Sequence, residues 1–230
     1  MLTGKLLGSG FARSTVGGKA APIVPYRLLI PDKGTANLQT LGAESARWKA
    51  TAQRFRGLSQ RGQLEQQVAN RAQFTDEVLA TVADNVRLGA CCVLVAETGD
   101  GKIVGAMSYA LIPPREGAIN LLAIDPGELV GAPGSRGLRG IGTAMVAAVS
   151  RQFLAQGVET VYLHPFDSAA ADFWGGRGFG VCGRGMLMCV RGKEGIGRLI
   201  DGCEALPDCE TCLVCGLARD VEAMRLPSAR

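Results

Sequence analysis

Apolar runs of strand length alternate with polar turns along this chain, and that pattern predicts an α/β protein. Each run ends at proline, glycine or an Asp-Gly pair, which are turn signals. The pair Asp100-Gly101 in particular predicts a tight hairpin between two neighbouring runs. We therefore expect strands at 25–30, 91–96, 102–111, 118–124, 158–163 and 186–190.

Other stretches repeat their apolar residues at helical spacing. From Asn37 to Arg87 the composition shifts to Ala, Gln, Arg and Glu, which favours helices, and we expect Gly57 and Gly62 to divide this region into two. The second segment carries an apolar stripe, and a further helix ends at Gly157. The stripe consists of Leu64, Val68, Phe74, Val78, Leu79 and Val82, and the later helix repeats Met145, Val149 and Phe153.

The order of these elements predicts a mixed, mainly antiparallel sheet with helices on both faces. The strands from 91 to 124 follow one another through short connections and form an antiparallel meander. The strand 158–163 is reached through a helix, so it lies parallel to 118–124. A parallel pair that splays at its C-terminal ends opens a cleft for a ligand.

A glycine-rich turn between these two strands predicts an anion site. The sequence from Arg136 to Thr143 places Gly137, Gly140 and Gly142 directly before the helix. Glycines let backbone N–H groups turn toward a ligand, and a helix N-terminus adds partial positive charge. The order of glycines matches neither the P-loop nor the dinucleotide fingerprint. A tight connection without a ligand remains an alternative at this point.

A second motif follows the strand 158–163, and with it the chain resembles the GNAT superfamily of acyl-CoA-dependent N-acyltransferases. That family reads strand, [QR]-x-x-G-x-[GA], helix, strand, and then N-x-x-A-x-x-F-Y and G-F. Gly140 and Gly142 occupy the glycine positions here. The second motif is matched by Asp167, Ala170, Phe173, Trp174 and Gly178-Phe179. The match covers residues 90–190.

The resemblance implies an acetyltransferase fold in which acetyl-CoA binds the splayed strand pair. The pantetheine arm would pair with the backbone of 122–124, and the diphosphate would lie on the amides of 138–143, beside Arg136 or Arg139. Asp167 or Ser168 would begin the following helix. The expected binding residues are Leu122, Ala123, Ile124, Arg136, Gly137, Leu138, Arg139, Gly140, Ile141, Gly142, Thr143, Asp167, Ala170, Phe173 and Trp174.

We expect direct transfer of an acetyl group to a primary amine of a small molecule or protein. His164, Asp125 and Tyr109 are the candidate catalytic groups. His164 and Asp125 follow the strands that border the cleft, and Tyr109 could act as the acid toward the leaving thiolate. Gly137 replaces the family's Gln or Arg, and Trp174 replaces a tyrosine that often acts as the acid. The alternative function is therefore an acyl-CoA sensor or interaction module without efficient turnover.

The composition of the chain argues against several classes of binding partner. The net charge of +4 is too mild to favour nucleic-acid binding, and the chain's single histidine excludes His-rich metal sites. No apolar run has membrane-spanning length, so we expect a cytoplasmic protein without membrane contact. Whether the protein is a homodimer or a monomer stays open.

Both ends of the chain differ from the central part, and we expect three regions. Residues 1–24 are basic and lack acidic side chains, which predicts a flexible segment, with a targeting or secretion segment as the alternative. Residues 25–191 form the acetyltransferase domain, and 192–230 form an extension. We expect Cys91, Cys92, Cys182 and Cys189 to be buried as small apolar side chains. Within the extension, Cys203, Cys209, Cys212 and Cys215 either bind structural zinc or pack on the domain.

Overall fold

The structure of the chain is a computed structural model. It describes residues 1–14, 23–89, 92–129, 132–183 and 186–204. Residues 202–204 are described by their backbone alone. Within these ranges, none of the helices is long and apolar enough to cross a lipid bilayer.

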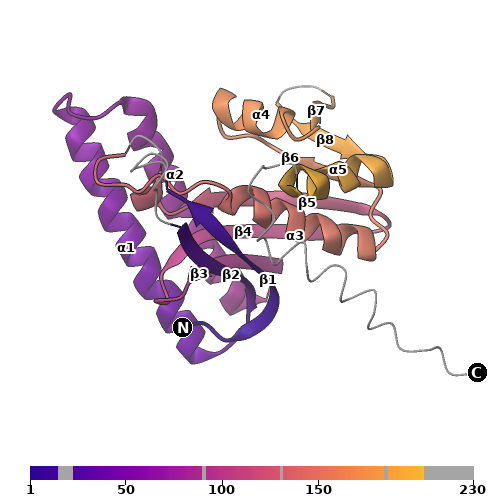
Figure 1. Ribbon diagram of the computed structural model, residues 1–230, viewed down its shortest axis with the longest axis horizontal. Coiled ribbons are helices and arrows are strands. Elements are labelled where there is room, and N and C mark those ends of the chain that lie inside the picture. Colours follow the sequence, from indigo (N-terminus) through magenta and orange to yellow (C-terminus); the bar gives the residue numbers. More distant parts are fainter. Residues whose placement is uncertain (15–22, 90–91, 130–131, 184–185, 205–230) are drawn as a thin grey trace, which may run out of the picture.

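The described residues form one eight-stranded sheet in the order β1-β2-β3-β4-β5-β6-β8-β7 (Figure 1). All neighbouring strands are antiparallel except β5 and β6, which are parallel. The mixed, mainly antiparallel sheet predicted from the sequence is therefore confirmed. The strands are β1 Gly4–Arg13, β2 Ile23–Pro31, β3 Cys92–Thr98, β4 Ile103–Ile112, β5 Glu116–Ile124, β6 Thr160–Leu163, β7 Gly180–Val181 and β8 Met188–Arg191.

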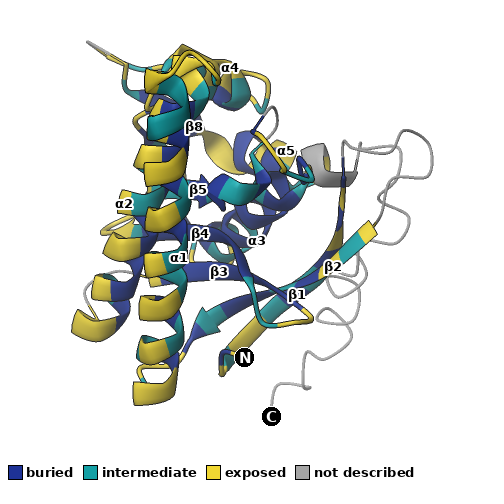
Figure 2. Ribbon diagram, turned by 90° about the vertical axis from the view of Figure 1, so that its left-hand side faces the viewer, coloured by how far each residue is buried: buried dark blue, intermediate teal, exposed yellow. Residues whose placement is uncertain are grey.

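Helices cover both faces of this sheet, as Figure 2 shows. On one face, Trp48 of α1 and Leu79 of α2 are fully buried against the central strands. On the other face, Met145 and Phe153 of α3 belong to a second core. The helices are α1 Thr35–Gln60, α2 Gln66–Leu88, α3 Ile141–Ala155, α4 Ser168–Gly175 and α5 Gly192–Glu204, with a short 3₁₀ helix η2 at Pro126–Glu128.

The division of the first helical region differs from the prediction at one glycine. Gly57 lies inside α1, and the chain breaks only after Gln60. A single glycine in a helix costs about 1 kcal/mol, and the burial of Ala52 and Phe55 in the preceding turn offsets this cost. Gly62 does lie in the break, with a positive φ of 68°.

The prediction of a flexible segment at 1–24 is wrong for its first half. Strand β1 pairs with β2 over its whole length and forms an edge of the sheet. The reason lies in its small residues. A Cβ added at Gly10 would come within 2.7 Å of the Tyr26 hydroxyl, so the Tyr26 ring packs against this strand. Half of this strand is Gly, Ser and Ala, and its larger apolar residues Leu6 and Phe11 are exposed, so it lacks the apolar alternation that would reveal it in the sequence.

The core also extends past Arg191, where we placed the end of the domain. Helix α5 packs on α3 and buries Ile196 and Leu199 in the same core. Of the cysteines predicted as a zinc site, Cys203 is described by its backbone alone. Cys209, Cys212 and Cys215 lie outside the described residues.

Candidate active site

The two parallel strands separate halfway along β5. Strand β6 pairs with β5 from Glu116 to Ile119, and the remainder of β5 has no β6 partner. On its other side β5 pairs with β4, and the register shifts so that Asn120 is an extra residue. Such a bulge bends a strand and increases its twist. The bulge at Asn120 therefore lies directly after the last residue of β5 that pairs with β6, where the sequence predicts that the two strands splay.

The glycine-rich turn ends where α3 begins. Gly137 and Gly140 have positive φ values of 58° and 96°, which side chains rarely allow. Gly140 is the N-cap of α3 and provides no side-chain hydrogen bond. The first-turn amides of Ile141, Gly142 and Thr143 therefore have no partner within the helix.

Burial distinguishes this helix start from two others. Helices α1 and α2 also begin without a side-chain cap, but the first two residues of each are exposed to solvent. In α3, by contrast, Ile141 is 1% exposed and Thr143 is 7% exposed. Buried amides need an acceptor, so this helix start is suited to binding an anionic group.

Gly142 lies where the end of β5, the start of α3 and α4 converge. A Cβ at this position would be 3.9 Å from Leu122, from Ile124 and from Phe173. These distances are ordinary van der Waals contacts, and φ is not positive here. The fold itself therefore does not require glycine at 142. Its lack of a side chain leaves room above the helix start.

Helix α4 is fastened at its own N-terminus. The Asp167 carboxylate accepts a hydrogen bond of 2.7 Å from the backbone amide of Ala170, the capping role expected for Asp167. Arg71 of α2 approaches the same carboxylate at 3.3 Å. Beside this ion pair, the rings of Phe74 and Phe166 stack with centroids 4.2 Å apart. Helix α2 thus adjoins the loop that follows β6.

Arg177 is a site residue that the sequence analysis missed. Its guanidinium donates hydrogen bonds to the Thr143 hydroxyl and, over 2.9 Å, to the Phe173 carbonyl oxygen. It also lies 3.5 Å from the centroid of the Phe173 ring. Arg177 therefore joins α4 to the first turn of α3 and places a cation beside it. The only signal in the sequence is its position in the Gly-Gly-Arg-Gly-Phe segment.

The two arginines of the turn behave differently from the prediction. The Arg136 side chain is bound to the buried carboxylate of Glu128, with its Nε 3.1 Å from both oxygens. This pair engages Nε and Nη2 of the guanidinium while the side chain is 41% exposed, so phosphate binding by Arg136 stays a prediction. The backbone amide of Arg139 donates a 3.0 Å hydrogen bond to the Arg13 carbonyl oxygen, while its side chain is exposed. Strand β1 thus holds the middle of the turn.

The sequence matches the model of the acetyltransferase (GNAT) family over residues 61–180, more than half of the chain. The chain belongs to this family. No curated protein matches it.

Solved structures of GNAT proteins share only a partial likeness with this chain. A variant of the AtaT toxin bound to the C-terminus of the antitoxin AtaR and acetyl-CoA aligns with a TM-score of 0.44 and 15% identity, over 55% of this chain and 84% of that one. Tetrahymena GCN5 aligns with a TM-score of 0.46 and 16% identity, over 71% and 93%. The assignment to the family rests on the sequence match.

Two of the predicted catalytic residues of this GNAT protein are enclosed. Asp125 is 0% exposed, and its carboxylate lies 2.8 Å from Arg47 and 2.9 Å from Lys102. Tyr109 is 1% exposed and donates a 2.6 Å hydrogen bond to Gln152. Burial raises the pKa of Tyr109. Both environments suit structural roles better than proton transfer to a substrate.

His164 and Trp174 lie in contrasting places. His164 follows the last residue of β6 and is exposed. Trp174 is 6% exposed and packs edge-to-face against Phe173 and Phe179. The tryptophan is thus a core residue of α4 that lies under the site. Its indole N–H does not act as an acid at ordinary pH. Of the three predicted catalytic residues, His164 alone is exposed to solvent.

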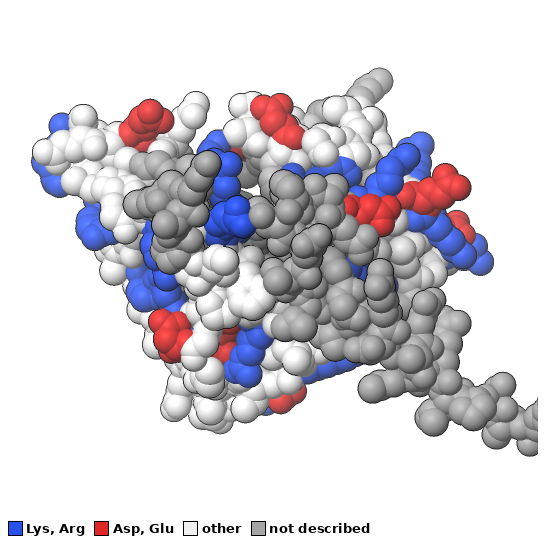
Figure 3. All heavy atoms as spheres, viewed as in Figure 1, with Lys and Arg blue, Asp and Glu red and all other residues white. Residues whose placement is uncertain are grey.

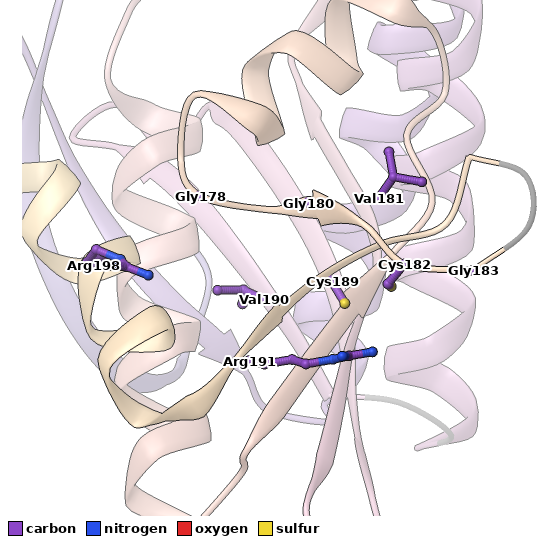
Figure 4. Close-up of a pocket in the computed structure, with 9 residues that line it drawn as sticks. All are labelled: Gly178, Gly180, Val181, Cys182, Gly183, Cys189, Val190, Arg191 and Arg198. Atoms are coloured by element: carbon purple, nitrogen blue, oxygen red, sulfur yellow. The ribbon is translucent and has the colours of Figure 1, made fainter.

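A separate hollow of about 470 Å³ lies at the β7–β8 edge and shares no residue with the predicted coenzyme site (Figure 4). Cys182 and Cys189 line it; Cys189 is buried, as predicted, whereas Cys182 is only half-buried. Burial and a hydrogen bond with Cys189 raise the pKa of Cys182 to about 11. The Cys182 thiol is therefore protonated at neutral pH. The prediction that Cys92 is buried is wrong, since this residue is exposed at the start of β3, and Cys91 lies outside the described residues.

Proposed function

We propose that this GNAT protein transfers an acetyl group from acetyl-CoA to a primary amine by direct attack in a ternary complex. The observation that carries the proposal is the buried, uncapped first turn of α3, which faces the end of β5 where β6 has departed. The amides of 141–143 would bind the diphosphate.

The pantetheine arm would bind along the free side of β5. Strand residues alternate the direction of their N–H and C=O groups, so part of 120–124 bonds to β4 and part faces the gap. An extended thiol-bearing arm can therefore pair with the strand end as a short added strand. This arrangement would place the thioester in the splay, between Asn120 and the loop after β6.

The chemistry then requires a neutral amine and support for the tetrahedral oxyanion. We propose His164 as the group that accepts the amine proton, either directly or through a water molecule. The loop that contains it is held by the Phe74–Phe166 contact and the Arg71–Asp167 ion pair. These contacts would fix the position of the acceptor relative to the thioester.

The acceptor is identified only as a primary amine of a small molecule or a macromolecule. On the face drawn in Figure 3, acidic and basic side chains are interspersed among the described residues. No class of acceptor is favoured by charge on this face. The alternative of an acyl-CoA sensor keeps one supporting observation: Trp174, in the place of the family's tyrosine, is buried.

Two measurements on the purified protein test the proposal. Calorimetry with CoA measures binding, and labelled acetyl-CoA with a panel of small amines, peptides and aminoacyl-tRNA measures transfer. We expect CoA to bind and one acceptor class to be acetylated. Tight CoA binding without transfer or thioester hydrolysis would favour the sensor, and absence of CoA binding would end both readings.

A further inference from the structure

Six charged side chains next to the end of β5 and the glycine-rich turn form a continuous series of ion pairs with no net charge. Carboxylates and cations alternate along it from helix α1 to the glycine-rich turn. Its members, in order of contact, are Glu44, Arg47, Asp125, Lys102, Glu128 and Arg136.

The first half of this series fixes the end of β5. Arg47 contacts Asp125, the residue directly after β5, at 2.8 Å. The other Asp125 oxygen accepts a 2.9 Å hydrogen bond from the amide of Gly127 and starts η2. Because Asp125 is fully buried, its charge depends on these partners.

The second half fixes the start of the turn. Glu128 is 3% exposed and accepts hydrogen bonds from both Lys102, at 2.6 Å, and Arg136. The Arg136 carbonyl oxygen in turn accepts a 2.6 Å hydrogen bond from the Ser14 hydroxyl. Arg136 is therefore held by its side chain and its backbone, one residue before Gly137.

Lys102 joins the two halves, because its ammonium group contacts Asp125 and Glu128 together. One cation thus sets the spacing between the end of β5 and the start of the turn. In the proposed complex these are the places that hold the pantetheine arm and the diphosphate. The same CoA molecule must reach both.

We propose that Glu128 is a positioning residue for coenzyme binding. Through Lys102 and Arg136 it holds the glycine-rich turn at the distance from β5 that lets one CoA molecule contact both. This inference rests on the proposed function, since it assumes that CoA occupies the splay and the turn.

A competing role for Arg136 predicts the opposite result. If Arg136 were a direct phosphate ligand, Glu128 would compete with the diphosphate for its guanidinium. Replacing Glu128 by the neutral Gln would then release Arg136 and tighten CoA binding. Under the positioning role, the same change loosens the turn and weakens CoA binding.

The test compares Glu128→Gln with wild type, by calorimetry with CoA and with pantetheine, which lacks the diphosphate. We expect CoA affinity to fall about tenfold or more, because one hydrogen bond to a charged group contributes on that order. Pantetheine affinity should stay within about twofold of wild type, since it contacts β5 alone.

Glu97→Gln is the matched control. Glu97 is also fully buried and paired with an arginine, Arg27, at 2.6 Å, but its other partner is the amide of Leu2. This variant should lose thermal stability and keep CoA affinity. If Glu128→Gln does not fold by circular dichroism, Glu128→Asp keeps the charge, withdraws the carboxylate from Lys102 and Arg136, and should weaken CoA binding as well.

Several outcomes would overturn the inference. Unchanged or tighter CoA binding in Glu128→Gln would do so, as would an equal loss in Glu97→Gln or an equal loss of pantetheine. Each of these results leaves the proposed function intact if wild-type protein binds CoA. If wild type does not bind CoA, the proposed function itself fails.

Discussion

Helices α3 and α4 border the same candidate site, and they begin in different ways. Helix α4 starts at Asp167, whose carboxylate accepts from its first turn, and Arg71 supports that carboxylate. Helix α3 starts at Gly140 with no side-chain acceptor, although its first residues are buried. A helix start that is satisfied within the chain holds the structure together. A buried start that is not satisfied is suited to a ligand.

The sharpest way to break this comparison is a carboxylate on α3. Gly142→Glu would project a negative side chain toward Leu122, Ile124 and Phe173, where the diphosphate is proposed to bind. Like charges placed together cost several kcal/mol, so we expect CoA affinity to fall at least about a hundredfold. Calorimetry measures the loss, and circular dichroism checks the fold.

Gly42→Glu is the control for that variant. Gly42 lies in α1 with nothing within 4 Å of an added Cβ, and its φ is not positive. It introduces the same side chain away from the site and should leave CoA affinity unchanged. Equal CoA affinity in both variants would contradict the proposed site.

The opposite change removes the acceptor from α4. Asp167→Ala deletes the N-cap and should cost about 1 kcal/mol of unfolding free energy, or about 3 °C in Tm for a chain of this size. Asp167→Asn should restore most of the stability, because asparagine is also a good N-cap. A Tm unchanged in Asp167→Ala would show that the cap contributes nothing.

The ion pairs of Glu128 with Lys102 and Arg136 make the stability of the glycine-rich turn depend on pH. Burial alone would raise the pKa of Glu128, but hydrogen bonds from Arg136 and Lys102 outweigh burial and hold this pKa below its ordinary value of 4.5. The stabilisation is then present above pH 4.5 and is lost as the pH falls through the folded-state pKa. We expect the Tm difference between wild type and Glu128→Gln to shrink as the pH is lowered below that value. A Tm difference that stays constant down to about pH 3, well below the ordinary pKa of a glutamate, would argue against a stabilising role of the Glu128 charge.

The smallest expected effect comes from adding a side-chain cap to α1, where no ligand is proposed to bind. Gly34 precedes α1 with extended backbone angles and nothing within 4 Å of an added Cβ. Gly34→Asp should stabilise the protein by a few tenths of a kcal/mol, roughly the difference between Gly and a good cap, and leave CoA binding unchanged. Urea unfolding resolves the change, and weaker CoA binding would mean that α1 contributes to the site.

Most of the sheet could be predicted from local patterns. The apolar runs in the sequence predicted strands β2 to β6 and β8. The helix between β5 and β6 predicted that these two strands are parallel. The paired motifs around Gly142 and Asp167 predicted the family, which the family match over residues 61–180 confirms. These features depend on residues close together in the chain, so spacing and residue type suffice to find them.

Tertiary structure decided the features that join distant segments. Strand β1 has no apolar alternation and becomes visible only because β2 and Tyr26 pack against it. Arg136 was predicted to bind phosphate, yet it pairs with Glu128, and Asp125 is held by Arg47 from α1. A local pattern shows which charges are present, but the partner of each charge is set by packing between elements far apart in the sequence. For that reason the sequence by itself determined the fold class and the family, and only the folded chain decided which charged side chains pair with one another.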